Sequence, residues 1–446
     1  MKTAGKLYII GLIIHLLYNV VIISTDNVIS HCWHVDNGNL TEIINMHNSD
    51  SRSYIESADG YIKEGVFSYK NMPDYHRTIG YPLIIAIFKM ISWKYWYILL
   101  TIFQTFVGTL IYPLSFLIGK IFLPKDDKKI FYSIITMMLL GGYFTKSLYV
   151  LSDMTFSVFF LSGVYFSLLS TTKRNDILII ILGFILITFA ALIRPVLILY
   201  PIVHFLILLY ISKYYKTWNY QKTKLKVILS ALLLILSVNI SSVRIYHYYK
   251  NISPTDILGI NMFDYTVKNV MIKENQLPKY IKLEKDINKE RNWLIKDKKR
   301  KNIFFNTFKE YPVTTIMFWI KRGAFVHLFY PHYMQIGEIY GYFNKEKTGR
   351  NKPMTKSVFM QIVLYLFAVV NFIIFLFFAL YLFEQLVYYK QILFFITILF
   401  MVFFVLGPSF LAPTSPRMRL PVEPFIFIFA FKYLFQNFSL KFIVLN

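Results

Sequence analysis

With 446 residues, of which 56% are hydrophobic and only 16% charged, and a mean hydropathy of +0.50, the chain has the composition of an integral membrane protein, since a soluble domain carries about 25% charged residues. The formal net charge of +24 does not indicate a nucleic-acid partner, because the basic residues flank apolar runs on both sides of the predicted membrane. The single cysteine, Cys32, excludes an intramolecular disulfide framework and a cysteine-based zinc cluster.

Apolar runs recur along most of the chain, and several approach or exceed the roughly 20 residues that cross a bilayer. The first run follows Lys2 and Lys6, and no small-x-small cleavage site follows it, so we expect a retained anchor rather than a signal peptide. The pattern predicts an all-α polytopic membrane protein with about ten spanning helices. We place them at about 7–25, 95–119, 129–145, 148–170, 176–193, 196–212, 225–243, 356–384, 391–411 and 419–437.

The segment at about 26–94 separates the first two spans and contains a predicted amphipathic helix. Asp50 precedes apolar residues at helical spacing, and Gly65 is a natural stop. One interpretation is that Asp50 caps this helix, or leaves that role to Ser53 in a capping box with Glu56. The other is that Asp50 is a general base that accepts a proton from an attacking hydroxyl or amine. The apolar residues of the helix are Tyr54, Ile55, Ala58, Tyr61 and Ile62.

A basic pair, His76 and Arg77, then precedes the sequence Ile79-Gly80-Tyr81-Pro82 at the edge of an apolar run. The run at 79–93 has only about 15 residues, too few for a span, and contains Lys89. We therefore predict an interfacial or re-entrant helix here. Counting it as a span would invert every later loop against the positive-inside rule.

The distribution of lysines assigns each short loop to one side of the membrane. The positive-inside rule places the loops near 120–129, 173–174 and 213–226 in the cytoplasm, together with both termini. The segments 26–94 and 244–355 then lie on the non-cytoplasmic side of a cell (inner) membrane. We accordingly divide the chain into a membrane module at 1–243, an outer segment at 244–355 and C-terminal helices at 356–446.

Asp153 begins the predicted fourth helix on the outer side, and Lys146 lies one short turn before it. As a structural residue, Asp153 is an N-cap that Ser152 assists and that the helix dipole favours. As a functional residue, it is a second acid that faces the same cavity as Asp50 and orients the acceptor or holds a divalent ion.

Arg194 stands before Pro195 between two apolar runs. An arginine at membrane depth costs about 2.5–3.5 kcal/mol on insertion scales and usually faces a cavity or a partner. Arg194 therefore either extends to the lipid headgroups or contacts a phosphate, to which a guanidinium donates two hydrogen bonds.

The outer segment 244–355 contains 21 Lys and Arg against 10 Asp and Glu, a net charge of +11. Anionic lipid headgroups explain this excess, and a phosphate-rich or acidic acceptor explains it as well. Its stretch at 312–331 is apolar but interrupted by charges, which predicts a helix in the membrane interface. His332 is a candidate to line the site opening, with His76, Tyr54 and Lys146.

Arg417 and Arg419 form a basic pair at the outer end of the last predicted span. Positive charge is disfavoured in short outer loops, so topology gives no reason for them to be there. A lipid-phosphate headgroup is the ligand that a basic pair beside apolar sequence suits.

The ordered set of motifs resembles the membrane glycosyltransferases of the GT-C class, in particular bacterial relatives of protein O-mannosyltransferases and of the lipid A aminoarabinose transferase. The resemblance covers the first 215 residues well, the last 30 fairly and 244–355 hardly at all. It rests on five elements: Asp50-Ser51-Arg52-Ser53-Tyr54, Ile79-Gly80-Tyr81-Pro82, Ser152-Asp153, Ala191-Leu192-Ile193-Arg194-Pro195, and Arg417 through Pro424. Ser51 stands where eukaryotic members carry Glu, and the usual proline before Gly80 is missing.

The resemblance implies a polyprenyl-phosphate-linked sugar as donor and a lipid, glycan or protein as acceptor. Asp50 would be the base, and attack at the anomeric carbon would invert its configuration. The leaving phosphate would be matched by Arg77, Arg194 or the pair Arg417 and Arg419. No resident cofactor is implied, and a divalent cation is compatible with the site.

Two other functions fit a chain of this kind: a flippase or transporter of lipid-linked sugars, and a polysaccharide polymerase. Transporters carry charged residues along a central path within repeated halves. Here the charges gather at outer helix ends and no repeat is visible, which favours an enzyme that acts on one face. Polymerases share the outer arginines and stay open as an alternative.

Overall fold

The structure is a computed structural model that describes most of the chain. The described residues are 2–23, 49–70, 72–141, 143–148, 150–172, 177–194, 242–250, 255–324, 358–389 and 420–438, with single residues at 197, 228, 232, 240 and 398.

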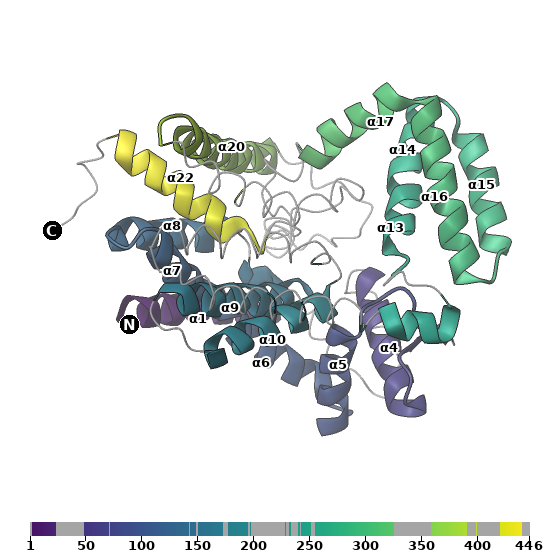
Figure 1. The fold of residues 1–446 in the computed structure, drawn as a ribbon, viewed down its shortest axis with the longest axis horizontal. Coiled ribbons are helices and arrows are strands. Elements are labelled where there is room, and N and C mark those ends of the chain that lie inside the picture. Colours follow the sequence, from purple (N-terminus) through teal and green to yellow (C-terminus); the bar gives the residue numbers. More distant parts are fainter. Residues whose placement is uncertain are drawn as a thin grey trace.

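Helices form this part of the chain apart from one two-stranded hairpin, as an all-α fold requires (Figure 1). The N-terminal half contains α1 (Lys2–Ile23), α4 (Ser49–Glu64), β1 (Ser68–Tyr69), β2 (Met72–Pro73), α5 (Gly80–Ile91), α6 (Trp96–Thr109), α7 (Ile111–Phe122), α8 (Asp127–Leu140), η1 (Tyr143–Lys146), α9 (Asp153–Thr172) and α10 (Ile177–Ile193). Further on lie α13 (Ile257–Ile260), η3 (Asn261–Val267), α14 (Lys268–Lys273), α15 (Leu277–Lys289), α16 (Trp293–Glu310), α17 (Pro312–Phe318), η4 (Trp319–Ala324), α20 (Val358–Val387) and α22 (Glu423–Asn437).

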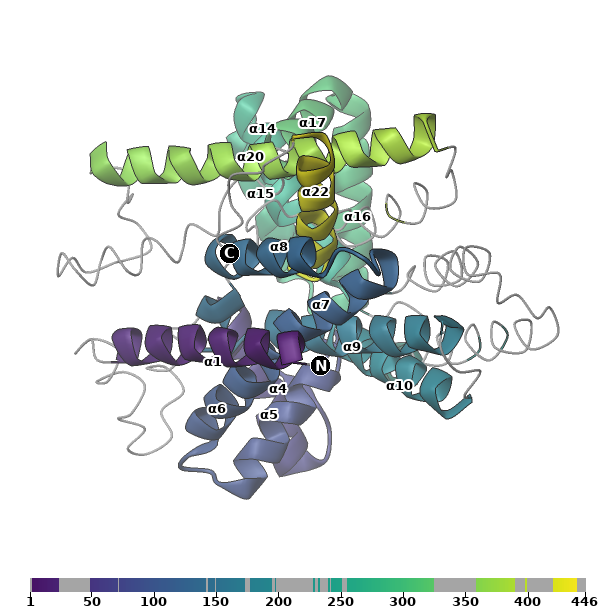
Figure 2. The same cartoon turned by 90° about the vertical axis from the view of Figure 1, so that its left-hand side faces the viewer.

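Three helical stretches among the described residues are long and apolar enough to cross a membrane. They are Lys2–Val20, Trp96–Phe122 (which joins α6 and α7) and Tyr365–Val387. Shorter apolar helices cover Gly80–Ile91, Asp153–Leu169 and Leu178–Ile193. In Figure 2, the axes of α1, α8 and α20 lie roughly parallel, and α22 crosses them.

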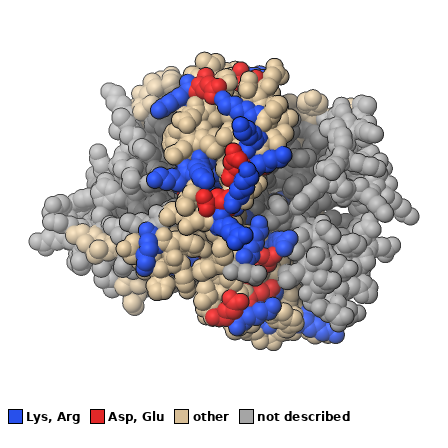
Figure 3. Space-filling model, turned by 90° about the vertical axis from the view of Figure 1, so that its right-hand side faces the viewer, with Lys and Arg blue, Asp and Glu red and all other residues tan. Residues whose placement is uncertain are grey.

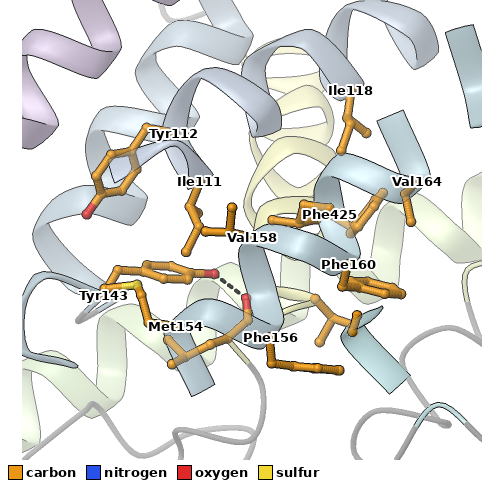
Figure 4. Close-up of a cluster of buried hydrophobic side chains, with 14 of the residues drawn as sticks. Ile111, Tyr112, Ile118, Tyr143, Met154, Phe156, Val158, Phe160, Val164 and Phe425 are labelled. Carbon is orange, nitrogen blue, oxygen red and sulfur yellow. Dashed lines mark hydrogen bonds between the residues drawn. The ribbon is translucent and has the colours of Figure 1, made fainter. Parts of the chain in front are cut away.

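The largest hydrophobic core joins α1 and α4–α10 to α20 and α22. Within it, Tyr112, Tyr143, Met154 and Phe425 converge from α7, η1, α9 and α22 (Figure 4). The Tyr143 hydroxyl donates to the backbone carbonyl of Leu420, so a residue just before α22 is fixed against the N-terminal module.

The helices η3 and α14–α16 form a separate hydrophobic core, in which the ring centroids of the stacked Phe263 and Tyr280 lie 5.1 Å apart. This group lies to one side of the apolar helices, at the right of Figure 1. We call residues 255–324 the outer helical unit.

The predicted helix after Asp50 is confirmed, and it ends as expected. Gly65 has φ +70°, a conformation that glycine adopts at little cost, and its N–H donates to the Tyr61 carbonyl. The capping-box interpretation is wrong, because α4 begins at Ser49 and Ser53 lies buried within it. Glu56 pairs instead with Arg52.

The short apolar run near 79–93 is a helix of 12 residues, α5, too short to span a bilayer upright. The predicted helix at 129–145 is displaced toward its N-terminus, since α8 covers Asp127–Leu140 and a 3₁₀ turn follows. Gly141 follows the last residue of α8. A Cβ atom at Gly141 would lie only 2.6 Å from the Met137 carbonyl oxygen. The spans predicted at 196–212, 225–243 and 391–411 fall outside the described residues, except for a few single positions.

Candidate active site

A buried ion pair joins the first residue of α9 to the residue that follows α10. Arg194 Nη1 donates to Asp153 Oδ1, and the side chains are 16% and 2% exposed. Asp153 is the first residue of α9 and Arg194 follows the last residue of α10, so each charge has the sign that its helix dipole favours. The Arg194 guanidinium also lies over the Phe156 ring, 5.7 Å from its centroid.

Small residues bring α9 and α10 close enough for this pair to form. A Cβ atom at Gly163 would lie 2.8 Å from the Gly183 carbonyl oxygen, and one at Gly183 would lie 2.6 Å from Ser167 Oγ. Close approach at glycines is typical of helix pairs in membranes. The same antiparallel contact aligns residue 153 with residue 194 at the end of the pair.

The Gly80 motif packs directly on the chain before Arg194. A Cβ atom at Gly80 would lie 2.7 Å from the Leu192 carbonyl carbon and 2.8 Å from the Ile193 nitrogen. Thr78 Oγ1 donates to the Ile193 carbonyl at 3.0 Å. Two motifs that are more than 100 residues apart in the sequence therefore form one contact.

Arg77 connects this contact to α4. Its Nε donates to Ser53 Oγ at 2.8 Å, and its guanidinium carbon lies 4.5 Å from the Tyr54 ring centroid. The Tyr54 hydroxyl lies 2.9 Å from Ser152 Oγ, next to Asp153 in the chain. An unbroken series of contacts thus runs from Arg77 through Tyr54 and Ser152 to the ion pair. We call this series the acid–arginine site.

His76 lies on the other side of Arg77. Its Nδ1 is 2.9 Å from Asp256 Oδ1, a carboxylate with no exposed surface in the outer helical unit. The backbone around His76 is held by Asp74 Oδ1, which accepts from the N–H groups of residues 76 and 77 at 2.7 and 2.9 Å. The sequence analysis expected His76 to line the cavity but missed Asp256 and Asp74. Asp74, two residues before His76, carries the signal of an Asx turn.

Asp50 lies in the first turn of α4, the end of the helix that contains Ser53 and Tyr54. Because α4 begins at Ser49, Asp50 does not precede the helix as an N-cap residue does, and any capping by Asp50 would come from within the first turn. Its side chain lies outside the part of the structure that is described, so the general-base interpretation stays a prediction. His332, Arg417 and Arg419 also fall outside the described residues.

Lys146 is buried in η1, which packs on α1, α6 and α9. Buried Glu423, at the start of α22, is a residue that the sequence analysis missed. Its Oε2 would lie 2.7 Å from a Cβ atom at Gly141. The sequence places this carboxylate within an apolar stretch, in Val422-Glu423-Pro424, and such a position marks an acid as a functional candidate.

Among the described residues, no group of three or more His, Cys, Asp and Glu side chains is arranged to hold a metal ion. Comparison with known proteins does not identify a family, because no family model, no curated protein and no solved structure matches this chain.

Proposed function

We propose that this protein is a membrane glycosyltransferase that moves a sugar from a polyprenyl-phosphate donor to a lipid, glycan or protein acceptor. In this proposal about ten helices span the cell membrane, both termini are cytoplasmic, and the acid–arginine site opens on the outer face. The lysine distribution supports this orientation. Lys120, Lys129 and Lys432 pair with Asp126 and Asp127 at the α8 end that the positive-inside rule places in the cytoplasm.

One observation carries the proposal. Four separated motif segments, around Tyr54, Arg77–Gly80, Asp153 and Arg194, meet in one polar cluster at the ends of apolar helices. A buried ion pair is weak evidence for stability, because desolvation offsets most of its attraction. Ionisable groups that face the interior beside apolar helices are functional candidates by default.

The proposed reaction is a displacement at the anomeric carbon. The acceptor hydroxyl or amine forms a bond to this carbon, the bond from carbon to phosphate oxygen breaks, and the configuration inverts. The acceptor proton passes to Asp50, and the polyprenyl phosphate leaves with the bonding electron pair. Arg77 and Arg194 stabilise the charge on the leaving phosphate, as cationic donors do at developing negative charge.

Asp153 has a positioning role in this scheme. Its carboxylate fixes the position of the Arg194 guanidinium, which in this scheme meets the phosphate oxygens of the donor. A divalent cation bound at Asp153 would have to share this carboxylate with Arg194, which contacts Oδ1.

The test is incubation of membranes containing the protein with labelled polyprenyl-phosphate sugars, followed by identification of the product. We expect label in a glycosylated acceptor and release of polyprenyl phosphate. Label that crosses the membrane still attached to its lipid would indicate a flippase instead. Label in a lengthening chain of repeats would indicate a polymerase.

A further inference from the structure

The chain around Arg77 lies between β2 and α5, and residues 74–79 have no regular secondary structure. Its backbone groups must therefore find hydrogen-bond partners outside a helix or a sheet. Asp74 Oδ1 accepts from the N–H groups of residues 76 and 77, whereas the carbonyl groups take donors from a distant part of the chain. We call residues 73–78 the Arg77 segment.

Four carbonyl groups of the Arg77 segment accept hydrogen bonds from residues 244–256. The pairs, donor first, are the Tyr249 hydroxyl with Pro73 at 2.5 Å, the Asp256 N–H with Tyr75 at 3.2 Å, the Thr255 hydroxyl with His76 at 2.7 Å, and Arg244 Nη2 with Arg77 at 3.0 Å. The rings of Tyr75 and Tyr249 also pack together, with centroids 5.4 Å apart. The course of the backbone through Arg77 thus depends on residues at least 167 positions away in the sequence.

Arg244 is the donor in this set whose side chain carries a positive charge. It lies in the helical residues 242–249, just beyond the span predicted at 225–243. A hydrogen bond from a guanidinium is stronger than one from a neutral donor. Arg244 Nε is buried and has no hydrogen-bond partner, which is costly for stability. A cation kept at this cost favours a role in the neighbouring site over a role in stability alone.

The side chain of Arg77 is held by a different part of the molecule from its carbonyl group. Its Nε donates to Ser53 Oγ at 2.8 Å, and its guanidinium lies over the Tyr54 ring, both on α4. The guanidinium therefore keeps its place only while the backbone of residue 77 stays fixed relative to α4. Arg244 supplies the charge-assisted contact to that backbone.

We propose that Arg244 is a positioning residue for sugar transfer. By holding the Arg77 carbonyl, it keeps the Arg77 guanidinium where the leaving phosphate is bound. Arg244 lies outside the five elements on which the GT-C resemblance rests. The contact of Arg77 with phosphate rests on the proposed function, whereas the fixing of the Arg77 segment by Arg244 does not.

Hydrogen exchange tests the positioning without sugar transfer. Full-length protein in phosphatidylcholine nanodiscs is compared with Arg244→Gln, and exchange is followed in peptides that cover the Arg77 segment. Loss of one charge-assisted hydrogen bond predicts exchange about tenfold faster at the amides of residues 76 and 77. Arg244→Lys keeps the charge but not the planar set of donors, so its exchange should lie between the two.

The control removes a positive charge elsewhere. Figure 3 shows the side of the molecule on which the outer helical unit lies, where Lys and Arg side chains form a band with Asp and Glu. Arg291 occupies an exposed position of this unit. Arg291→Gln should exchange as wild type does in the Arg77 segment.

Transfer kinetics then test whether Arg244 acts through Arg77. We expect Arg244→Gln to lower kcat/KM for the donor about tenfold in the wild-type background. In an Arg77→Lys background the same change should cause little further loss, because both substitutions impair one guanidinium contact.

Unchanged exchange in Arg244→Gln, or equally faster exchange in Arg291→Gln, would overturn the proposal. A transfer loss that adds in full to that of Arg77→Lys would also overturn it, because Arg244 would then act by another route. If wild type shows no transfer but exchange depends on Arg244, the proposed function fails while the positioning of Arg77 stands. If Arg244→Gln does not fold, Arg244→Lys replaces it in both comparisons, and exchange equal to wild type again overturns the proposal.

Discussion

At the scale of single residues, Arg194 has a defined geometry to test. Replacement by lysine keeps the charge but removes the planar set of donors that contacts Asp153 and, in the proposed function, a phosphate. We expect Arg194→Lys to lower turnover about tenfold or more, by the loss of one charge-assisted hydrogen bond in the transition state. Arg291→Lys, at an exposed position of the outer helical unit, is the control and should leave transfer unchanged. Full activity in Arg194→Lys would show that its guanidinium does not contact the donor.

Asp153→Asn tests the ion pair itself. Removal of one partner of a buried pair typically costs about 3–5 kcal/mol, because the other charge stays buried without compensation. We expect a lower unfolding temperature in detergent for Asp153→Asn and recovery of most of this loss in the double variant Asp153→Asn/Arg194→Gln. Transfer activity should not recover, since the proposed reaction needs Arg194 at the donor phosphate and Asp153 to position Arg194. A double variant as unstable as Asp153→Asn would contradict this account of the pair.

At the scale of helices, Gly80 fixes the approach of α5 to α10. A methyl group at this position would overlap the backbone at residues 192–193, which cannot move aside as a flexible side chain can. We expect Gly80→Ala to destabilise the protein by about 1–3 kcal/mol, as overpacking does, and to displace Arg194. Thermal unfolding and transfer activity measure the two effects. Gly5→Ala in α1 meets no atom within 4 Å and is the matched control.

Asp264 in η3 gives the outer helical unit a pH dependence. Burial raises the pKa of this carboxyl, and Arg300 opposes the shift. An acid with a raised folded pKa binds protons more readily in the folded state, so stability rises as pH falls from the folded pKa toward the unfolded value of about 3.9. We therefore expect Asp264→Asn to be more stable than wild type at neutral pH. This advantage should shrink in mild acid, as followed by thermal unfolding at each pH. A difference that did not change with pH would contradict the assignment.

Local patterns predicted most of the helices but few of their contacts. The helical spacing from Tyr54 to Ile62 and the glycine at position 65 predicted α4. The short apolar run around Lys89 predicted a helix too short to span a bilayer, which is α5. Periodicity carries no information on which distant residues meet. The sequence analysis treated Asp153 and Arg194 separately, although they pair, and offered no partner for His76, which contacts a residue 180 positions away.

At the scale of the whole molecule, the structure separates a core of apolar helices from the outer helical unit, which has its own hydrophobic core. His76 and Asp256 join the first outer segment to this unit, and Arg77 joins that segment to the acid–arginine site. These contacts link the outer helical unit, through His76 and Arg77, to the acid–arginine site.

The proposed reaction is base-assisted transfer of a sugar at the acid–arginine site, and the variant Asp50→Asn removes the proposed base. Transfer from a labelled polyprenyl-phosphate sugar is measured in membranes that contain equal amounts of wild-type and variant protein. Asparagine keeps the size and can still accept a hydrogen bond at a helix N-terminus, so a capping role alone predicts near-normal transfer. Removal of a general base predicts turnover lower by about 10²–10⁴-fold, with donor binding largely kept. Retention of most transfer activity in Asp50→Asn would contradict the account.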